Sequence, residues 1–178
     1  MSPVAGPFFA AALVLGTAGI LKVLRPDPTR LALRAAGLPG SAVIARGIGV
    51  VEVAIALAAI GWGGRIPAAL VAMAYLAFAG FSAVVRRRSG GRASCGCFGS
   101  STTPLTSFHV VADLLLAGVA IVAVADPVPG LFTVAADTPL AGVPFVAYTV
   151  LLAWLVQVAL TTLPELQAAV RQAPRPTR

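Results

Sequence analysis

The chain has 178 residues, of which 58% are hydrophobic and only 11% are charged. Its mean hydropathy of +0.94 excludes an ordinary soluble domain, in which about a quarter of the residues are charged. The formal net charge of +7 would suggest nucleic-acid binding in a soluble protein. Here the basic residues lie in links beside apolar stretches, where they set membrane orientation and meet anionic lipid. We therefore expect a lipid bilayer as the partner and no nucleic acid.

Five apolar stretches of 18 to 21 residues follow one another along the chain. About 20 helical residues cross a hydrocarbon core of ~30 Å, and lipid offers the backbone no hydrogen-bond partner, so such stretches must be helices. The sequence therefore predicts an all-α fold, a polytopic membrane helix bundle. The expected spans are residues 7–24, 43–62, 66–85, 108–125 and 143–163.

We expect residues 1–178 to form a single membrane domain. Pro164 is expected to stop the last span, which leaves residues 164–178 as a cytoplasmic tail. Small residues allow close helix packing in membranes, and glycines in the first two spans are candidate contact points. These glycines are Gly16, Gly19, Gly47 and Gly49.

The basic residues are distributed very unequally between the two sides of the predicted bundle. Only Arg65 lies in a link on one side, and twelve lie on the other. The twelve are Lys22, Arg25, Arg30, Arg34, Arg46, Arg86, Arg87, Arg88, Arg92, Arg171, Arg175 and Arg178. The positive-inside rule then predicts a plasma-membrane protein with its amino terminus outside and its carboxy terminus in the cytoplasm.

Both cysteines of the chain lie in the link between the third and fourth expected spans, in the motif Cys95-Gly96-Cys97-Phe98-Gly99. A disulfide needs its two α-carbons about 4.4 to 6.8 Å apart, and the intervening glycine gives the backbone the freedom to achieve this. A ring this small would be strained and easily reduced, which suits thiol exchange, and nearby arginines favour the thiolate. In the alternative reading the cysteines are small apolar residues in a turn.

Ionisable residues occur within the spans on the same side as the cysteines. Glu52 lies inside the second span, where an ionised group is costly and usually faces a partner in the bundle. We expect that partner among Arg46, His109 and Asp113. His109 and Asp113 are four residues apart, on one helix face, and His109 could act as a base for a thiol, a proton carrier or a metal ligand. Alternatively, Arg46 snorkels to the headgroups, His109 lies at the interface, and the two carboxylates fix helix register.

The chain resembles the MauE family of methylamine utilisation membrane proteins, relatives of the DoxX-like proteins. The resemblance rests on the cysteine motif and on the segment Arg46-Gly47-Ile48-Gly49-Val50-Val51-Glu52, and it covers about the first 125 residues. It implies a four-helix DoxX/MauE-like core, to which this chain adds a fifth, C-terminal transmembrane helix. It also implies a redox-associated protein with Cys95 and Cys97 as the redox pair. MauE itself is implied in maturing the disulfide-rich subunit of methylamine dehydrogenase, beside a thioredoxin-like partner.

Three functions remain open at this point. The first is a membrane thiol–disulfide protein in which Cys95 and Cys97 exchange with a thioredoxin-like partner or a quinone, while His109, Asp113 and Glu52 move protons. The second is a metal-binding protein, in which Cys95, Cys97 and His109 hold zinc or Cu(I). The third is a non-catalytic assembly subunit with a structural cysteine turn. In the first case a partner or a diffusible carrier must supply the rest of the relay, because the chain contains no second cysteine pair.

Overall fold

A computed structural model describes residues 2–89, 106–137 and 142–172 of the protein. Within these ranges the chain forms helices joined by short links, with one isolated β-bridge between Gly63 and Pro129 and no strand. The helices are α1 (Ala5–Leu24), α2 (Asp27–Ala35), α3 (Ala42–Gly61), α4 (Arg65–Ser89), α5 (Ser107–Ala125), α6 (Leu131–Ala136) and α7 (Gly142–Gln172). The all-α expectation is confirmed.

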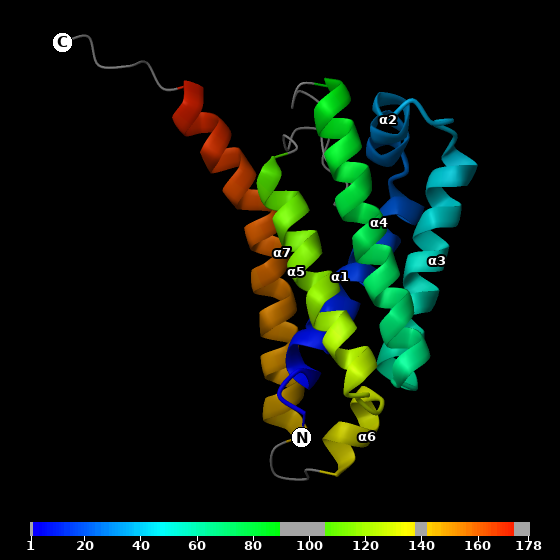
Figure 1. Ribbon diagram of the computed structural model, residues 1–178, viewed down its shortest axis with the longest axis vertical. Coiled ribbons are helices and arrows are strands. Elements are labelled where there is room, and N and C mark those ends of the chain that lie inside the picture. The colour runs from blue at the N-terminus through cyan, green and yellow to red at the C-terminus, as the bar shows by residue number, and fades with distance from the viewer. Residues whose placement is uncertain (1, 90–105, 138–141, 173–178) are drawn as a thin grey trace, which may run out of the picture.

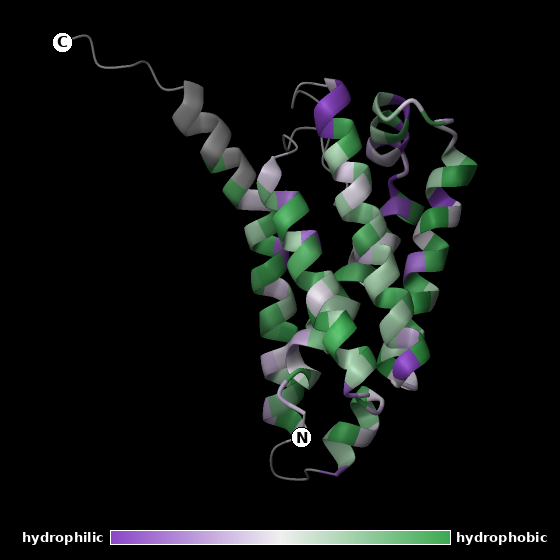
Figure 2. Ribbon diagram, in the orientation of Figure 1, coloured by the Kyte–Doolittle hydropathy of each residue, from purple (hydrophilic) through white to green (hydrophobic). Residues whose placement is uncertain are grey.

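Five of these helices are long and apolar enough to cross a membrane: α1, α3, α4, α5 and the part of α7 from Gly142 to Leu163. They run alternately up and down in one bundle, with the amino terminus, the α3–α4 turn and α6 at one end (Figure 1). Apolar residues cover the lengths of the helices, and hydrophilic residues gather at the opposite end, near α2 and the end of α4 (Figure 2). The chain is therefore a multi-pass membrane protein.

Helix α1 is the central helix of the bundle. In the most apolar 18 residues of α1, 56% of the residues are buried inside the protein, against 17% in the corresponding part of α7. Phe8, Phe9 and Leu15 of α1 are completely buried in the main core, together with residues of α3, α4, α5 and α6. Helix α1 packs most extensively on α3, and α4 on α5, while α7 lies along the outside against α1. The arrangement is a four-helix core with a fifth, peripheral span.

Glycines bring α1 and α3 into close contact. A methyl group added at Gly19 would lie 2.6 Å from the carbonyl oxygen of Gly49, and one at Gly49 would meet the carbonyl oxygen of Gly19 equally closely. At Gly16 an added methyl would lie 3.1 Å from the β-carbon of Ala56, whereas Gly47 faces open space. Three of the four predicted glycine contacts are therefore confirmed, and the expectation for Gly47 is wrong because that residue points away from α1.

At the α6 end of the bundle the α3–α4 turn packs on the segment that follows α5. Gly63 and Gly64 adopt left-handed conformations with φ of 64° and 84°, which residues with a β-carbon rarely adopt. This turn allows the amide of Gly64 to donate a hydrogen bond to the carbonyl of Val128, at 2.8 Å. Leu131 and Val134 of α6 are buried in the core, so this link is a packed part of the fold.

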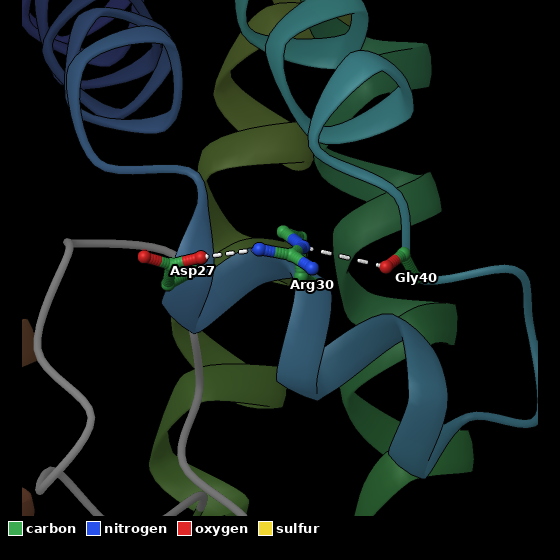
Figure 3. Close-up of polar contacts among 3 residues, drawn as sticks. All are labelled: Asp27, Arg30 and Gly40. Carbon is green, nitrogen blue, oxygen red and sulfur yellow. Dashed lines mark hydrogen bonds and ion pairs between the residues drawn. The ribbon is translucent and has the colours of Figure 1, made fainter.

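At the opposite end the link after α1 contains a short amphipathic helix, α2, that the sequence did not predict. The Arg88 guanidinium of α4 donates a hydrogen bond to the carbonyl of Ala36, at 2.7 Å, and so satisfies the carboxyl end of α2. On the exposed side, Arg30 pairs with Asp27 at 2.6 Å and donates a longer bond to the carbonyl of Gly40, at 3.4 Å (Figure 3). These contacts fix α2 across the ends of α3 and α4.

The last span ends at Leu163 as the sequence predicted, but its helix continues beyond that residue. Helix α7 runs from Gly142 to Gln172 and passes through Pro164, the residue expected to stop it. A proline removes one backbone hydrogen bond and bends a helix, but the flanking residues can continue the helix when they favour it. The segment expected to be a tail from residue 164 onward is therefore helical as far as Gln172.

Candidate functional site

A buried ion pair joins α1 to α3. The Nζ atom of Lys22 lies 2.7 Å from Oε2 of Glu52, and the two residues are only 4% and 3% exposed. The same ammonium lies 4.8 Å from the centre of the Phe78 ring on α4, a distance at which a cation is attracted to the ring face. The second carboxylate oxygen of Glu52, Oε1, is buried and has no hydrogen-bond partner among the described residues.

The geometry of the two helices directs these charged groups toward each other. Side chains on an α-helix lean toward its amino terminus, and α1 and α3 are antiparallel. Lys22 therefore leans into the bundle from the end of α1, and Glu52 leans back toward it from the middle of α3. The missing side chains of Gly49 and Gly19 leave room for the β-carbons of Lys22 and Glu52 respectively. Each glycine thus accommodates the charged residue of the opposite helix.

Two further polar residues connect this pair to α4 and α5. The hydroxyl of Tyr75, which is 2% exposed, donates a hydrogen bond to the carbonyl of Ala11 at 2.7 Å. Glu52 and Asp113 both lie close enough to Tyr75 to interact with it electrostatically. Asp113 is buried on α5, one turn after His109. Helices α1, α3, α4 and α5 therefore all contribute polar side chains to one interior region.

His109 is the third residue of α5 and takes part in a capping box at the helix start. The backbone N–H of Thr106 donates to Nδ1 of His109 at 3.4 Å, and the Thr106 hydroxyl lies 3.4 Å from the same nitrogen. A neutral imidazole has one accepting nitrogen and one N–H, so an accepting Nδ1 makes Nε2 the N–H donor. The ring is 2% exposed, and Nε2 has no partner among the described residues. His109 thus presents a buried N–H donor near the start of α5.

The structure corrects one sequence prediction directly. Glu52 points into the bundle as expected, but its ion-pair partner is Lys22 and not Arg46, His109 or Asp113. Arg46 lies on the exposed side of α3, where it cannot face the bundle interior. Lys22 was counted only as a flanking charge. The signal for it was in the sequence: it is the single lysine among thirteen basic residues, within the last turn of an apolar span.

The predicted redox residues Cys95 and Cys97 lie outside the described residues. The segment that carries them follows Ser89 at the end of α4 and precedes Thr106 at the start of α5, and these two helix ends lie at the same end of the bundle (Figure 1). His109 lies at that end as well. In residues 2–89, 106–137 and 142–172, no three or more His, Cys, Asp and Glu side chains are grouped closely enough to hold a metal ion. The alternative metal site at Cys95, Cys97 and His109 falls partly outside these ranges.

The fold and the buried ion pair define a compact multi-pass membrane protein with charged groups inside its helix bundle. The family of methylamine utilisation protein MauE matches residues 3–126, which include α1 to α5. The chain therefore belongs to the MauE family, membrane proteins of methylamine utilisation. No curated protein and no solved structure matches the chain. Helices α6 and α7 lie beyond the matched region, in agreement with a four-helix core and an added span.

Proposed function

We propose that this protein is a membrane thiol–disulfide redox protein in which Cys95 and Cys97 are the reactive pair. The observation that carries the proposal is the buried Nε2–H of His109 at the end of the bundle where the cysteine segment joins α4 and α5. A buried N–H donor without a partner is costly, and a nearby thiolate is a suitable acceptor. His109 is then a hydrogen-bond donor that stabilises a thiolate, because its other nitrogen is occupied by the helix cap.

In the proposed reaction a thiolate of a thioredoxin-like partner attacks one sulfur of the Cys95–Cys97 disulfide. The partner's second thiol resolves the mixed disulfide, so the partner is oxidised and the pair gains two electrons and two protons. Reoxidation passes two electrons and two protons to a quinone and restores the disulfide. The buried carboxyl groups of Glu52 and Asp113 are the groups proposed to accept and release the protons. Lys22 stabilises the ionised form of Glu52.

The proposal includes an orientation for the whole chain. We propose one membrane domain in the plasma membrane with its amino terminus outside, because twelve of thirteen basic residues belong to one side. The cysteine pair then faces the cytoplasm, although the family is usually pictured as supplying disulfides outside it. If the cysteine segment folds back into the bundle, the pair can act on thiols outside the cytoplasm. If the segment stays on the cytoplasmic side, the pair accepts electrons from cytoplasmic thiols and passes them outward.

Side-specific thiol labelling tests the redox pair and the orientation together. A membrane-impermeant maleimide should label Cys95 and Cys97 in inside-out vesicles after reduction, and should not label them in intact cells. A matched control carries Ser2→Cys with both native cysteines changed to serine, and it should label with the opposite sidedness. Cysteines that stay reduced in an oxidising glutathione buffer would contradict the redox function, and labelling from outside would contradict the orientation.

Two variants separate the Nε2 role of His109 from its capping role. Thr106→Val removes the hydroxyl beside Nδ1 but leaves the ring, so we expect it to weaken the helix start without changing the exchange rate at the cysteines. His109→Ala removes the donor, and we expect slower exchange and a higher pH for half-maximal reaction of the thiol with a maleimide. Equal effects of both variants would mean that His109 acts only as a helix cap.

A further inference from the structure

An apolar groove lies on the lipid-facing surface between α1 and α3. It has a volume of about 280 Å³ and is lined by aliphatic side chains only: Ile20, Val23 and Leu24 of α1 and Val50 and Val53 of α3. The groove lies beside the buried Gly19–Gly49 crossing, where the backbones of the two helices approach each other closely and Val23 and Val53 pack against the glycines. Ile20, Leu24 and Val50 are 50%, 69% and 58% exposed. A narrow aliphatic groove open to the bilayer fits an unbranched hydrocarbon chain.

Two arginines lie next to this groove at the α2 end of the bundle. Arg25 directly follows Leu24, and Arg46 lies one turn before Val50 on the same face of α3. Both residues are exposed, and neither forms an ion pair within the described part of the chain. Arg46 is four residues into α3, which places it about 6 Å from the start of the helix. Positive charge at the helix ends therefore lies where a phospholipid has its headgroup, and the aliphatic groove lies where it has its acyl chains.

Asp27, two residues after Arg25 in the sequence, forms no ion pair with either of these arginines. The side chain of Asp27 is held by Arg30, with 2.6 Å between Oδ1 and Nη1, and Arg30 also reaches the carbonyl of Gly40 (Figure 3). The groove therefore ends below two guanidinium groups whose charge is not balanced by a described carboxylate. Guanidinium groups bind phosphate through paired hydrogen bonds, and a zwitterionic headgroup would add a cation to a site that is already positive.

We infer that this groove binds one anionic phospholipid, with an acyl chain between α1 and α3 and the phosphate on Arg25 and Arg46. The site differs from the redox site of the proposed function, and it does not depend on the cysteines. Its occupant is an individual bound lipid.

Native mass spectrometry of the detergent-purified full chain tests this inference by titration with phosphatidylglycerol. We expect one phosphatidylglycerol to bind more tightly than phosphatidylcholine with the same acyl chains. Arg25→Gln and Arg46→Gln should each weaken binding about five-fold, and the double variant about 25-fold, since each basic group near a membrane surface contributes comparably. Arg65→Gln is the matched control: it removes the same charge from an exposed arginine at the other end of the bundle.

A second pair of measurements tests the groove separately from the charges. Val50→Trp should fill the groove and weaken phosphatidylglycerol binding, while Met73→Trp, at an exposed position on α4, should not. Glycerol phosphate, which has no acyl chain, should not compete. Equal affinity for the two lipids, an equal loss in Arg65→Gln, unchanged binding in Val50→Trp, or competition by glycerol phosphate would each overturn the inference.

Discussion

Removing one partner of the Lys22–Glu52 pair should be far more damaging than removing both. The two groups are 4% and 3% exposed and 2.7 Å apart, so in the native geometry neither charge is in contact with water. Breaking a buried ion pair by removing one side costs about 3 to 5 kcal/mol, whereas replacing both sides with neutral groups of similar size is often nearly neutral. We therefore expect a coupling free energy of about 3 kcal/mol between Lys22→Met and Glu52→Gln.

The two single variants should also differ from each other. Lys22 is in the last turn of α1, so in Glu52→Gln its flexible side chain can turn toward the headgroups and regain water. Glu52 lies ten residues into α3, about 15 Å from the helix start, so in Lys22→Met it cannot regain water in this way and must take up a proton to become neutral. Lys22→Met also loses the contact with Phe78, a cation–ring interaction of about 2 kcal/mol when it is shielded from water. Lys22→Met should therefore be the less stable variant.

The measurement is reversible unfolding in bicelles or mixed micelles, with the wild type, both single variants and the double variant compared as a double-mutant cycle. Arg65→Met, which removes an exposed cation at the other end of the bundle, is the control for effects of a lost cation on expression and membrane insertion. Additive losses, with a coupling below about 0.5 kcal/mol, would refute the ion pair as a structural unit. A Glu52→Gln variant less stable than Lys22→Met would refute the reasoning about access to water.

The remaining predictions concern backbone contacts and one hydroxyl. Gly49→Ala should lower the free energy of unfolding and weaken the Lys22 contact because its methyl group meets α1, whereas Gly47→Ala, which faces open space, should be neutral in the same assay. Tyr75→Phe should cost about 1 kcal/mol through the lost hydrogen bond to α1, and the half-exposed Tyr148→Phe should cost less in the same unfolding measurement. Gly63→Ala should cost at least about 1 kcal/mol, measured likewise, because its φ of 64° is unfavourable for alanine.

The transmembrane part of the fold could be predicted from sequence because the bilayer imposes one length and one backbone structure. The helices therefore fall close to the expected spans, with α3 at Ala42–Gly61 against an expectation of residues 43–62. The short helix α2 was not predicted, because its nine residues carry no membrane-length pattern and its position depends on Arg88 from another helix. Pro164 follows the end of the membrane-length part of α7 at Leu163, as expected, but the helix itself continues, because a single proline does not determine whether its neighbours remain helical.

The interior polar site was predictable only by residue type. An acidic residue in a span predicts a buried partner. Which residue is that partner depends on which helices cross and at which position along their lengths. That information is in the Gly19–Gly49 approach, which places α3 beside the end of α1. The expectation of Arg46 as a partner for Glu52 used only its position near the same membrane boundary. Six residues along a helix, however, turn a side chain well away from the starting face, and Arg46 is exposed.

The position of the ion pair beside the glycine crossing suggests what the pair does for the fold. A crossing formed by small residues has few interlocking side chains, so α1 and α3 could shift along each other with little loss of packing. A shift by one helical turn, about 5.4 Å, would separate Nζ of Lys22 from Oε2 of Glu52 and leave at least the carboxylate unpaired in an apolar interior. The glycines thus permit close approach and the charges select one register. Phe78 of α4 contacts the same ammonium, so the register of α1 and α3 also helps to fix the position of α4 along the bundle axis. The end of α4 joins the cysteine segment.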